Sequence, residues 1–591
     1  LLAVACQRDS AGDESPAEVI VAESEEVVVT RVVRRTVVAP AATAVESAAP
    51  IQLDVSFVGD YGTLDPQLAL DDNGLDVLEN LFVGLTRYDL ASDQVVPALA
   101  QTWESASGGR QWTFELRDDI FWVRAEAEGL NPLRDNQPEV TAVRPVVAAD
   151  VVFAVQRLCD ARMPTADVFI YFIIEGCQAA HSLDDEVTQA DLDRIGVTAP
   201  DDETVVFRLT EPAGYFLTMT SLAQMRPVPA ELVVEMGEEW TMEADLLTSG
   251  PFVLSPETVR GTRTVLRRNP HWPLPRNGNV DVVSIFHLDS AVDAFELWQE
   301  RNLDLSPMPV GQQEDALRRY GSRVRLVPEQ AVFYLAFNFN SPVFGEPALR
   351  RAFSWAIDRE RLIEEVYGGR GLPMRHLAPP GTVGAPPPDE VGMGYNPDRA
   401  RLQMANSSQG DCRLLPTMSY MVSSSDLALQ QAELLRDMWM EELGCNENQF
   451  IIEQVQFGTL LANTRPDAGA VRPDMWDLGW APYYPDENNW VRDLLHCVDS
   501  ENRPRRPCSP ADDLMIAAAR STDVDERWEL YRRVERALFG EESEEPVAPL
   551  FARADYVLVQ SWISYTPAYF GGEQFDQYQV DAEVKALEKL R

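Results

Sequence analysis

Hydrophobic residues recur along this chain at two spacings, one typical of strands and the other typical of helices. Residues 51–60 read IQLDVSFVGD and alternate between apolar and polar positions as a strand does, and the TLDPQ that follows indicates a turn. Apolar residues then recur every three or four positions, which places Leu75, Leu78, Leu81 and Phe82 on one face of a helix. Strand, turn and helix are therefore predicted in that order.

The next two hundred residues predict two hairpins and a helix. Alternation between TWES and QWTFELRDD puts Trp112, Phe114 and Leu116 on one face of the first hairpin. FVLSPETVRGTRTVLRRNP is predicted as a second hairpin that turns at its Arg-Gly dipeptide, and AADVVFAVQRLCDARM as a helix. Residues 123–145 are polar and contain proline, so we interpret them as an insertion.

The second half of the chain alternates strands with longer helices. Strand–helix–strand units are predicted over 279–307 and 418–457, a helix over 347–369, a loop over 377–397, a helix over 526–541 and a strand pair over 547–560. No segment repeats at the period of a solenoid. The pattern as a whole predicts a mixed α/β protein.

Length and charge restrict the number of cores and the partners. A chain of 591 residues exceeds the usual size of one hydrophobic core, so two to four lobes are expected. The net charge of −45 is spread over the whole length, which argues against nucleic acid and against docking on anionic lipid. The longest apolar run, VFIYFII at 168–174, is too short to span a bilayer and is interpreted as a core element.

The first six residues, LLAVAC, are apolar or small and end in a cysteine. They resemble the lipobox of bacterial lipoproteins, in which the signal is cut just before the cysteine and the thiol carries a diacylglycerol. On this interpretation Cys6 is the lipid attachment site, residues 1–6 are the remnant of the signal and residues 7–50, of low complexity, are a flexible tether. A frayed terminus is the alternative.

Six cysteines remain after Cys6 and form three pairs that are local in sequence. An even number of such cysteines suits an oxidising, extracytoplasmic compartment, and six buried reduced thiols are the alternative. The predicted disulfides are Cys159–Cys177, Cys412–Cys445 and Cys497–Cys508. No CxxC motif is present and the five histidines lack metal-ligand spacing, so neither a metal nor a cofactor is expected.

Motifs of catalysis are missing from the sequence. It contains no GxSxG, HExxH or GxxxxGK[ST] motif, and no GxGxxG opens a helix after a strand. The glycines of YGGRGLP follow a helix rather than precede one, so they indicate a helix end. Paired acidic residues are too common in so acidic a chain to single out a glycosidase-like pair. We therefore expect a protein that is not an enzyme.

Five segments, taken in order, resemble the family 5 solute-binding proteins of bacterial ABC importers, the oligopeptide- and dipeptide-binding group. Residues 123–145 depart from the family pattern, which has a short turn there, and so do the loop at 377–397 and the cysteine pairs. The similar segments are TLDPQLALDDNGLDVLENLFVGL…WTFELRDDIFW (63–122), PVVAADVVFAVQRL (145–158), SGPFVLSPETVRGTRTVLRRNPHW (249–272), YLAFNFNSPVFGEPALRRAFSWAIDRERLIEEVYGGRGLP (334–373) and DMWDLGWAPYYPDENNW (474–490).

This resemblance implies the fold, the domains and the role. The fold would be an α/β, three-lobed periplasmic-binding-protein-like clamp (type II, Venus-flytrap) with an extra lobe. The protein would be a monomer that captures a peptide or similar small organic solute between two lobes and delivers it to a membrane permease. The expected lobes are lobe I (51–86, 224–328 and 545–591), lobe II, the extra lobe (87–223), and lobe III (329–544).

Residues on both sides of the expected cleft are candidates for ligand binding. Aromatic rings would line a mostly apolar pocket, and polar side chains would orient the ligand. The candidates are Leu70, Asp71, Asp72, Asn338, Trp480, Tyr483, Tyr484 and Asp486. Two other classes of function stay open. One is a surface lipoprotein of the same fold that acts as a sensor, chaperone or surface-layer component, and the other is a hydrolase.

The resemblance also bears on the ligand, because peptide binders of the family pair the peptide's α-ammonium with an aspartate. The aligned position here is Tyr483, whose neutral phenol cannot supply that charge at pH 7. Asp486, Asp71 or Asp72 would have to compensate. A peptide is the leading ligand class, and sugars or other uncharged ligands that stack on aromatic rings are the alternative.

Overall fold

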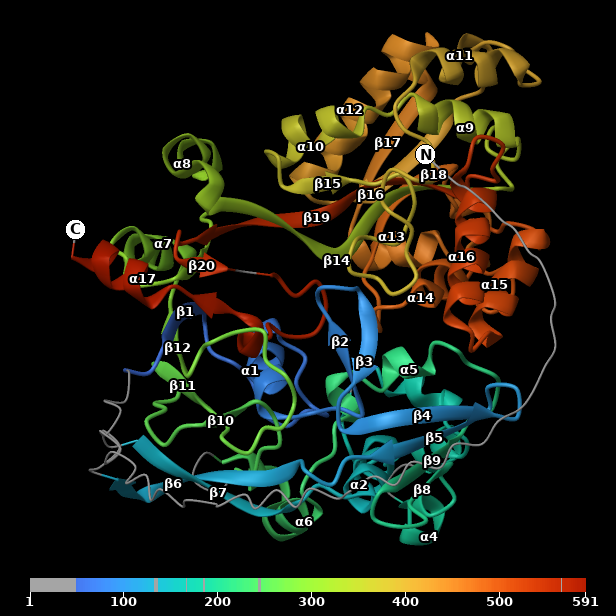
Figure 1. Cartoon of the computed structure of the whole chain (residues 1–591). Coiled ribbons are helices and arrows are strands. Elements are labelled where there is room, and N and C mark those ends of the chain that lie inside the picture. The colour runs from blue at the N-terminus through green and yellow to red at the C-terminus, as the bar shows by residue number, and fades with distance from the viewer. Residues whose placement is uncertain are drawn as a thin grey trace, which may run out of the picture. The chain divides into compact units, whose positions relative to one another are not determined.

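The computed structural model describes residues 49–131, 137–165, 167–183, 186–242, 246–564 and 566–590. The predictions for Cys6 and for nearly all of segment 7–50 therefore concern residues outside these ranges. Residues 50–591 form one compact unit, and its elements mix helices and strands as the sequence predicts (Figure 1).

A four-stranded sheet contains the predicted first strand. Its order is β1–β12–β11–β10, with β1 parallel to β12 and the remaining pairs antiparallel. The second predicted hairpin is confirmed as β10 and β11. The elements of this region are β1 (Gln52–Val58), α1 (Asp72–Leu81), α6 (Ala230–Met236), η5 (Gly237–Thr241), β10 (Phe252–Leu254), β11 (Arg263–Arg268), β12 (Val282–Leu288), α7 (Ala291–Gln299), η10 (Phe575–Gln577) and α17 (Ala582–Lys589), with the small pair β20 (Ile563–Ser564) and β21 (Gln579–Val580).

A second four-stranded sheet has the order β4–β5–β9–β8. The first predicted hairpin is confirmed as β4 and β5, and Trp112, Phe114 and Leu116 are all buried. The elements here are β2 (Thr86–Asp89), β3 (Gln94–Pro97), β4 (Ala100–Ala106), β5 (Gln111–Leu116), α2 (Ala148–Cys159), η2 (Val168–Ile173), α3 (Cys177–His181), α4 (Gln189–Leu192), β8 (Val197–Thr198), β9 (Thr204–Arg208), α5 (Phe216–Met219) and η4 (Ala223–Met225).

The interpreted insertion at 123–145 has regular structure. It forms most of an antiparallel ribbon of β6 (Phe121–Asn131) and β7 (Gln137–Pro145). The apolar run 168–174 is a core element as predicted, because Tyr171, Ile173 and Ile174 belong to the main hydrophobic core, whereas Phe169 is 49% exposed. The run therefore packs into the core and leaves only the Phe169 ring largely at the surface.

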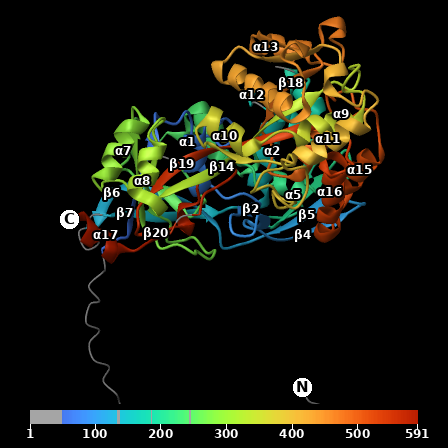
Figure 2. The ribbon, with the colours of Figure 1, turned by 90° about the horizontal axis from the view of Figure 1, so that it is seen from above.

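The largest sheet has seven strands and carries helices on both faces. Its order is β13–β19–β14–β18–β16–β17, and β15 pairs with β19. Along β14, Leu335 and Phe337 face the core that contains α9 to α12, whereas Tyr334 and Ala336 face the core that contains α13 to α16. This period-two alternation is the signature of a sheet covered on both sides (Figures 1 and 2).

The bounds of this region correct three predictions and confirm a fourth. Residues 279–307 do not form one βαβ unit, since β12 and β13 lie in different sheets. Residues 547–560 form one long strand rather than two. The helix over 347–369 is divided, because Asp358 accepts a hydrogen bond from the Arg361 backbone N–H (3.0 Å) and starts a second helix. The helix end predicted at YGGRGLP is confirmed, because Gly368 caps α10 in the left-handed conformation, and the short strand β15 follows it.

The elements are β13 (Leu305–Pro307), α8 (Gln313–Tyr320), η6 (Gly321–Arg323), β14 (Val324–Phe337), α9 (Pro347–Trp355), α10 (Arg359–Tyr367), β15 (Gly371–Pro373), α11 (Pro397–Asn406), η7 (Cys412–Leu414), β16 (Met418–Ser423), α12 (Asp426–Leu443), η8 (Glu447–Gln449), β17 (Phe450–Val455), α13 (Phe457–Asn463), η9 (Gly469–Val471), β18 (Met475–Trp480), α14 (Glu487–Leu495), α15 (Pro510–Arg520), α16 (Val524–Phe539) and β19 (Val547–Val559). The unit β16–α12–β17 is confirmed as a parallel pair joined by a helix. The loop predicted at 377–397 is confirmed up to Asn396.

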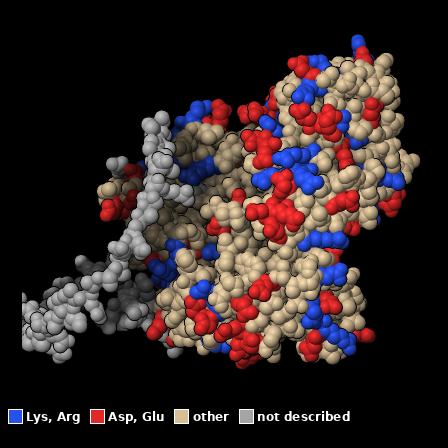
Figure 3. All heavy atoms as spheres, turned by 45° about the vertical axis from the view of Figure 1, so that its right-hand side comes forward, with Lys and Arg blue, Asp and Glu red and all other residues tan. Residues whose placement is uncertain are grey.

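All three predicted disulfides are present. Cys159–Cys177, Cys412–Cys445 and Cys497–Cys508 have Cα–Cα distances of 5.1, 4.9 and 5.1 Å. These distances fall within the range that a disulfide requires. Within the described ranges, no helix is both long and apolar enough to cross a membrane. Acidic and basic side chains are interspersed on the face that Figure 3 shows.

Candidate ligand-binding site

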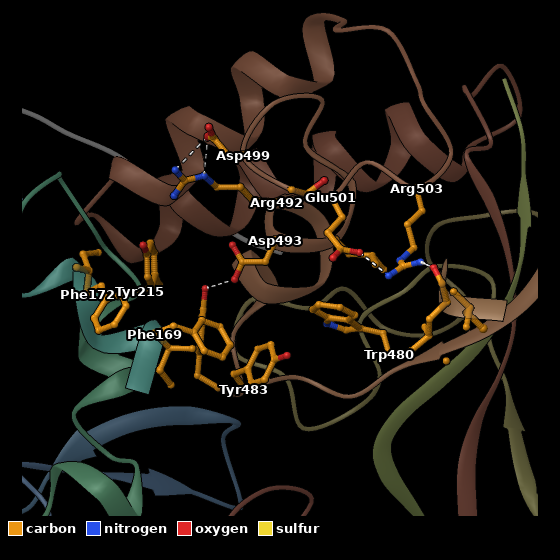
Figure 4. Close-up of a pocket in the computed structure, with 18 of the residues that line it drawn as sticks. Phe169, Phe172, Tyr215, Trp480, Tyr483, Arg492, Asp493, Asp499, Glu501 and Arg503 are labelled. Atoms are coloured by element: carbon orange, nitrogen blue, oxygen red, sulfur yellow. Dashed lines mark hydrogen bonds and ion pairs between the residues drawn. The ribbon is translucent and has the colours of Figure 1, made fainter. Parts of the chain in front are cut away.

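Two cavities meet at Tyr483, which lines both of them. The first, called the aromatic cavity, has a volume of about 680 Å³ and lies between η2 with Tyr215 on one side and Trp480, Tyr483 and α14 on the other (Figure 4). The second, called the acidic cavity, has a volume of about 470 Å³ and lies between α1, residues 568–574 and residues 327–331 of β14. Segments far apart in the sequence therefore form the walls of each cavity.

Aromatic rings from two regions meet across the aromatic cavity. Phe169 of η2 packs edge-on against Tyr483, with ring centroids 4.9 Å apart. Trp480 packs edge-on against the same tyrosine at 5.9 Å, and Tyr215 stacks on Tyr484 at 5.5 Å. The Phe169–Tyr483 and Tyr215–Tyr484 pairs join residues 169–215 to residues 480–484, so these two aromatic contacts bridge the walls.

Both arginines of the aromatic cavity are already ion-paired. The Arg492 guanidinium lies 3.1 Å from the carboxylates of both Glu211 and Asp499. The Arg503 guanidinium lies 2.6 Å from the Glu501 carboxylate. Because their charges are matched within the fold, these arginines offer little attraction to an anionic ligand.

Asp493 of α14 also lines the aromatic cavity. Its carboxylate accepts hydrogen bonds from the Tyr484 hydroxyl (2.6 Å) and from the Asn489 amide (2.9 Å), and Trp480 donates its indole N–H to Asn489 (3.1 Å). Burial raises the pKa of Asp493 to about 6, although these donors favour the ionised form. The polar network therefore fixes the carboxylate next to the aromatic wall.

The acidic cavity is lined by five carboxylates and two arginines. Arg226 pairs with Glu79, and Arg553 pairs with Glu329. Burial and the neighbouring Glu573 raise the pKa of Asp76 well above its usual value. The lining acids are Asp72, Asp76, Glu79, Glu329 and Glu573.

The structure brings four of the predicted ligand-binding residues to these cavities. Trp480, Tyr483 and Tyr484 line the aromatic cavity, and Asp72 lines the acidic cavity. Asp71, which precedes Asp72, is occupied as the cap of α1, where its carboxylate accepts from the Gly74 backbone N–H (2.8 Å).

Three other predicted residues, Leu70, Asn338 and Asp486, line neither cavity. Leu70 is 60% exposed, and Asn338 is buried and donates its amide to the Pro473 carbonyl (3.0 Å). Asp486 is fully buried, forms an ion pair with Arg527 and accepts from the Thr218 hydroxyl (3.0 Å). Such contacts give Asn338 and Asp486 a structural part, because their polar atoms are already paired inside the protein.

Sequence reasoning missed Phe169, Tyr215, Arg492 and Asp493 as lining residues. Phe169 lies in a run that was interpreted as core. Asn489, Arg492 and Asp493 share one face of α14, opposite the buried Leu494 and Leu495, so their spacing does mark a polar face. That spacing alone predicts a face toward solvent, and only the packing of η2 and Tyr215 makes it the wall of a cavity.

One group of side chains has the geometry of a metal site. Among the described residues His496, Cys497 and Asp512 bring ligand atoms within 4.8 Å of one another. The Cys497 sulfur is bonded to Cys508, and His496 Nδ1 accepts from the Asp499 backbone N–H (2.9 Å). A disulfide sulfur is no thiolate, so this group does not fit a metal.

Comparison with known proteins gives one consistent result. The family model of the bacterial extracellular solute-binding proteins, family 5 (middle), matches residues 94–502. The periplasmic oligopeptide-binding protein OppA of Salmonella typhimurium is 26% identical, over 92% of this chain and 95% of its own length. A protein of Escherichia coli described as a probable deoxycholate-binding periplasmic protein, YgiS, is 26% identical over 86% and 89%.

Solved structures agree in fold. The unliganded open form of the periplasmic murein tripeptide-binding protein MppA matches with a TM-score of 0.75 and 23% identity, over 90% of this chain and 96% of that one. Another structure of the Escherichia coli protein MppA matches with a TM-score of 0.57, over 90% and 99%. The predicted fold class, an α/β clamp of the periplasmic binding proteins, is thus confirmed.

Proposed function

The chain belongs to the bacterial extracellular solute-binding proteins of family 5, and on this premise we propose that it captures a peptide or similar small organic solute for an ABC importer. The observation that carries the proposal is the pair of cavities that meet at Tyr483 between distant segments of the chain. The solute occupies this cleft and passes from it to the membrane permease. Relatives named as oligopeptide-binding proteins favour a peptide as the ligand class.

We further propose that the lobes move about β14 and β19. The lobes are those expected from the sequence: lobe I (51–86, 224–328 and 545–591), lobe II (87–223) and lobe III (329–544). β14 runs across the boundary between lobes I and III at 328/329, and β19 begins just after the boundary at 544/545. Together these two strands act as a hinge that lets the lobes close on a ligand.

The likeness to the open MppA structure supports an open arrangement here, because the TM-score falls from 0.75 to 0.57 for another structure of the same protein. A binding protein has no need of catalysis, in keeping with the sequence. The proposed protein is an extracytoplasmic monomer, held at the membrane by a lipid on Cys6.

Calorimetry on the full chain tests the ligand class. Peptides of two to five residues are titrated into three proteins, which are wild type, Trp480→Ala and Tyr395→Ala. Deoxycholate is titrated into the same proteins in parallel. Tyr395 is 46% exposed and bonded to Glu442, so it serves as an aromatic control outside both cavities. We expect a peptide to bind wild type and the control alike and Trp480→Ala at least about tenfold more weakly. If only deoxycholate binds, the ligand class proposed here is wrong. If all three proteins bind with equal affinity, the ligand does not occupy the cavity that Trp480 lines.

A further inference from the structure

We propose that the aromatic cavity selects a ligand that carries an ammonium group, and that Asp493 is the residue that pairs with this group. The inference rests on the proposed solute-binding function and specifies the chemistry of its ligand. It begins with the charges that line the cavity.

The aromatic cavity contains four carboxylates and two guanidinium groups. Arg492 pairs with Glu211 and Asp499, and Arg503 pairs with Glu501. Asp493 is the fourth acid, and within the described part of the chain no cationic side chain lies within 4.0 Å of its carboxylate oxygens. Its hydrogen-bond donors are Tyr484, Asn489 and, at 3.5 Å, Asn488, and all three are neutral. Asp493 therefore has no ion pair of its own, and Arg492, which pairs with Glu211 and Asp499, acts on it only from a longer distance.

The surroundings of Asp493 suit an organic cation. In Figure 4 its carboxylate lies among Tyr215, Tyr483 and Trp480, and the Tyr484 ring that bonds it stacks on Tyr215. Aromatic faces attract an ammonium through their quadrupole, and the attraction grows when water is excluded. A carboxylate beside several rings therefore offers a cation both charge and ring faces.

A negatively charged ligand group fits this position poorly. It would meet an excess of carboxylates, and the two arginines are already occupied by acids of the cavity. A neutral ligand would exclude water from the Asp493 carboxylate without giving it an ion-pair partner, which costs free energy. An ammonium removes that cost, so the cavity discriminates in favour of cations.

Protonation of Asp493 gives the inference a second readout. Burial raises its pKa to about 6, so a cation has less charge to pair with as the pH falls through that value. Wild-type affinity should therefore fall on acidification, whereas an asparagine at this position removes the dependence. The charged or titratable groups that surround Asp493 are Glu211 and Tyr215 of the extra lobe, Tyr483, Tyr484, Asp486 and Arg492 around α14, and Asp499, Glu501 and Arg503 of the following loop.

The experiment uses two matched probe pairs and the full chain. The first pair is the tripeptide Ala-Phe-Ala with a free or an acetylated N-terminus, and the second is phenethylamine and phenethyl alcohol. Each is titrated by calorimetry at about pH 7.5 and about pH 5. The proteins are wild type, Asp493→Asn and Asp525→Asn. The last variant removes the same charge from an exposed position of α16 outside the cavity.

We expect the cationic member of a pair to bind wild type and Asp525→Asn about 30-fold or more tightly than its neutral partner, and Asp493→Asn to lose this preference. Wild-type binding of the cationic probes should weaken at the lower pH. If free and acetylated peptides bind equally and Asp493→Asn binds like wild type, the inference is overturned while the proposed function stands. The wild-type comparison of the paired probes decides the question even if Asp493→Asn does not fold.

The amine pair separates the two proposals. Selective binding of phenethylamine through Asp493, without binding of either peptide, supports the inference and contradicts the peptide as ligand class. Binding of no probe to wild type overturns both.

Discussion

Helix α14 has two aspartates near its two ends whose surroundings are opposite. Asp486, at the N-cap, is fully buried, forms an ion pair with Arg527 and accepts from the Thr218 hydroxyl of α5. Asp493, near the C-terminal end, lines the aromatic cavity and is bonded only to neutral donors in the described structure. One residue type therefore serves the fold at one end of the helix and faces a cavity at the other.

The difference shows how to separate structural charges from those available to a ligand. A buried carboxylate that has a cation partner contributes to the fold, and removing that partner is costly. A carboxylate at the wall of a cavity that has no ion pair with the protein can still form one with a ligand. Burial and residue type do not distinguish these cases, whereas the partners do.

The largest expected effect is on stability, and it comes from a change at the buried end of α14. Arg527→Met removes the cation that faces Asp486 and should lower the free energy of unfolding by about 3–5 kcal/mol, because an unpaired charge is left inside the protein. Urea denaturation measures it. Arg532→Met is the control, since Arg532 is partly exposed and its ion pair with Glu390 (3.4 Å) should contribute less than about 1 kcal/mol. Equal losses for the two variants would contradict the structural role of Asp486.

The end of α14 that lines the aromatic cavity is followed by a loop that the Cys497–Cys508 disulfide closes. Replacing Cys497 and Cys508 by serine should lower stability by about 3 kcal/mol on the chain-entropy model, because the loop contains about ten residues. Since this loop carries Asp499, Glu501 and Arg503, ligand affinity should fall as well.

The matched control replaces Cys412 and Cys445, which lie outside both cavities. It should lower stability by about 4 kcal/mol, somewhat more because its loop is longer, without weakening ligand binding. Denaturation and calorimetry on both variants separate the effects. A loss of affinity common to both would mean that the loop has no specific part in shaping the cavity.

Glu487, the residue after Asp486, gives a pH-dependent test of the buried end of α14. Its side chain is fully buried, and burial and the charge of Glu535 raise its pKa well above the usual range of a glutamate. The neutral form is favoured in the folded state, so this contribution to stability is complete below about pH 4.5 and is lost as the pH rises through the folded pKa.

Glu487→Gln should remove that loss. The stability of wild type relative to the variant should decline with rising pH, by no more than about 1.4 kcal/mol per pH unit for one proton. Denaturation curves of both proteins between about pH 4 and pH 9 test this difference. Parallel stability profiles would show that the Glu487 carboxyl titrates in the same way in the folded and unfolded chain.

The smallest expected effect concerns the hydrogen bond from Tyr484 to Asp493. Tyr484→Phe should cost about 1 kcal/mol of stability. Because this bond favours the ionised carboxylate, its loss should raise the pKa of Asp493 further, and carbon-13 spectra of the carboxyl measure the shift. Tyr483→Phe, which loses a hydroxyl with no bond to Asp493, is the control. An unchanged titration in Tyr484→Phe would mean that the tyrosine does not tune the acid.

The fold could be predicted from sequence because its signals are local or extend over whole segments. Alternation identified β4 and β5, and all three disulfides join cysteines close in sequence. Long-range pairing was less accessible. Residues 547–560 were predicted as two strands, because nothing local shows that β19 pairs along its length with both β13 and β14.

The candidate site was predictable only in part. Trp480, Tyr483 and Tyr484 lie in a recognisable segment, and the structure places all three at the aromatic cavity. Asp486 and Asp493 could not be ranked from sequence, because the cation that neutralises Asp486 comes from α16, forty-one residues away. The side chains that oppose Asp493 come from η2 and the residues before α5, far earlier in the chain.

The interrupted ladder between β14 and β19 has a kinetic consequence. Their register shifts between Pro328 and Val332, and residues 329–331 have no partner in the described strand pairs of β14. Amides at this interruption should exchange with deuterium sooner than those of the paired residues on either side. Labelling over time would then divide β14 into two slow blocks around one fast site, whereas β19 stays paired there through Arg553 and Gly371 of β15. A ligand that holds the two blocks of β14 together should slow that site most.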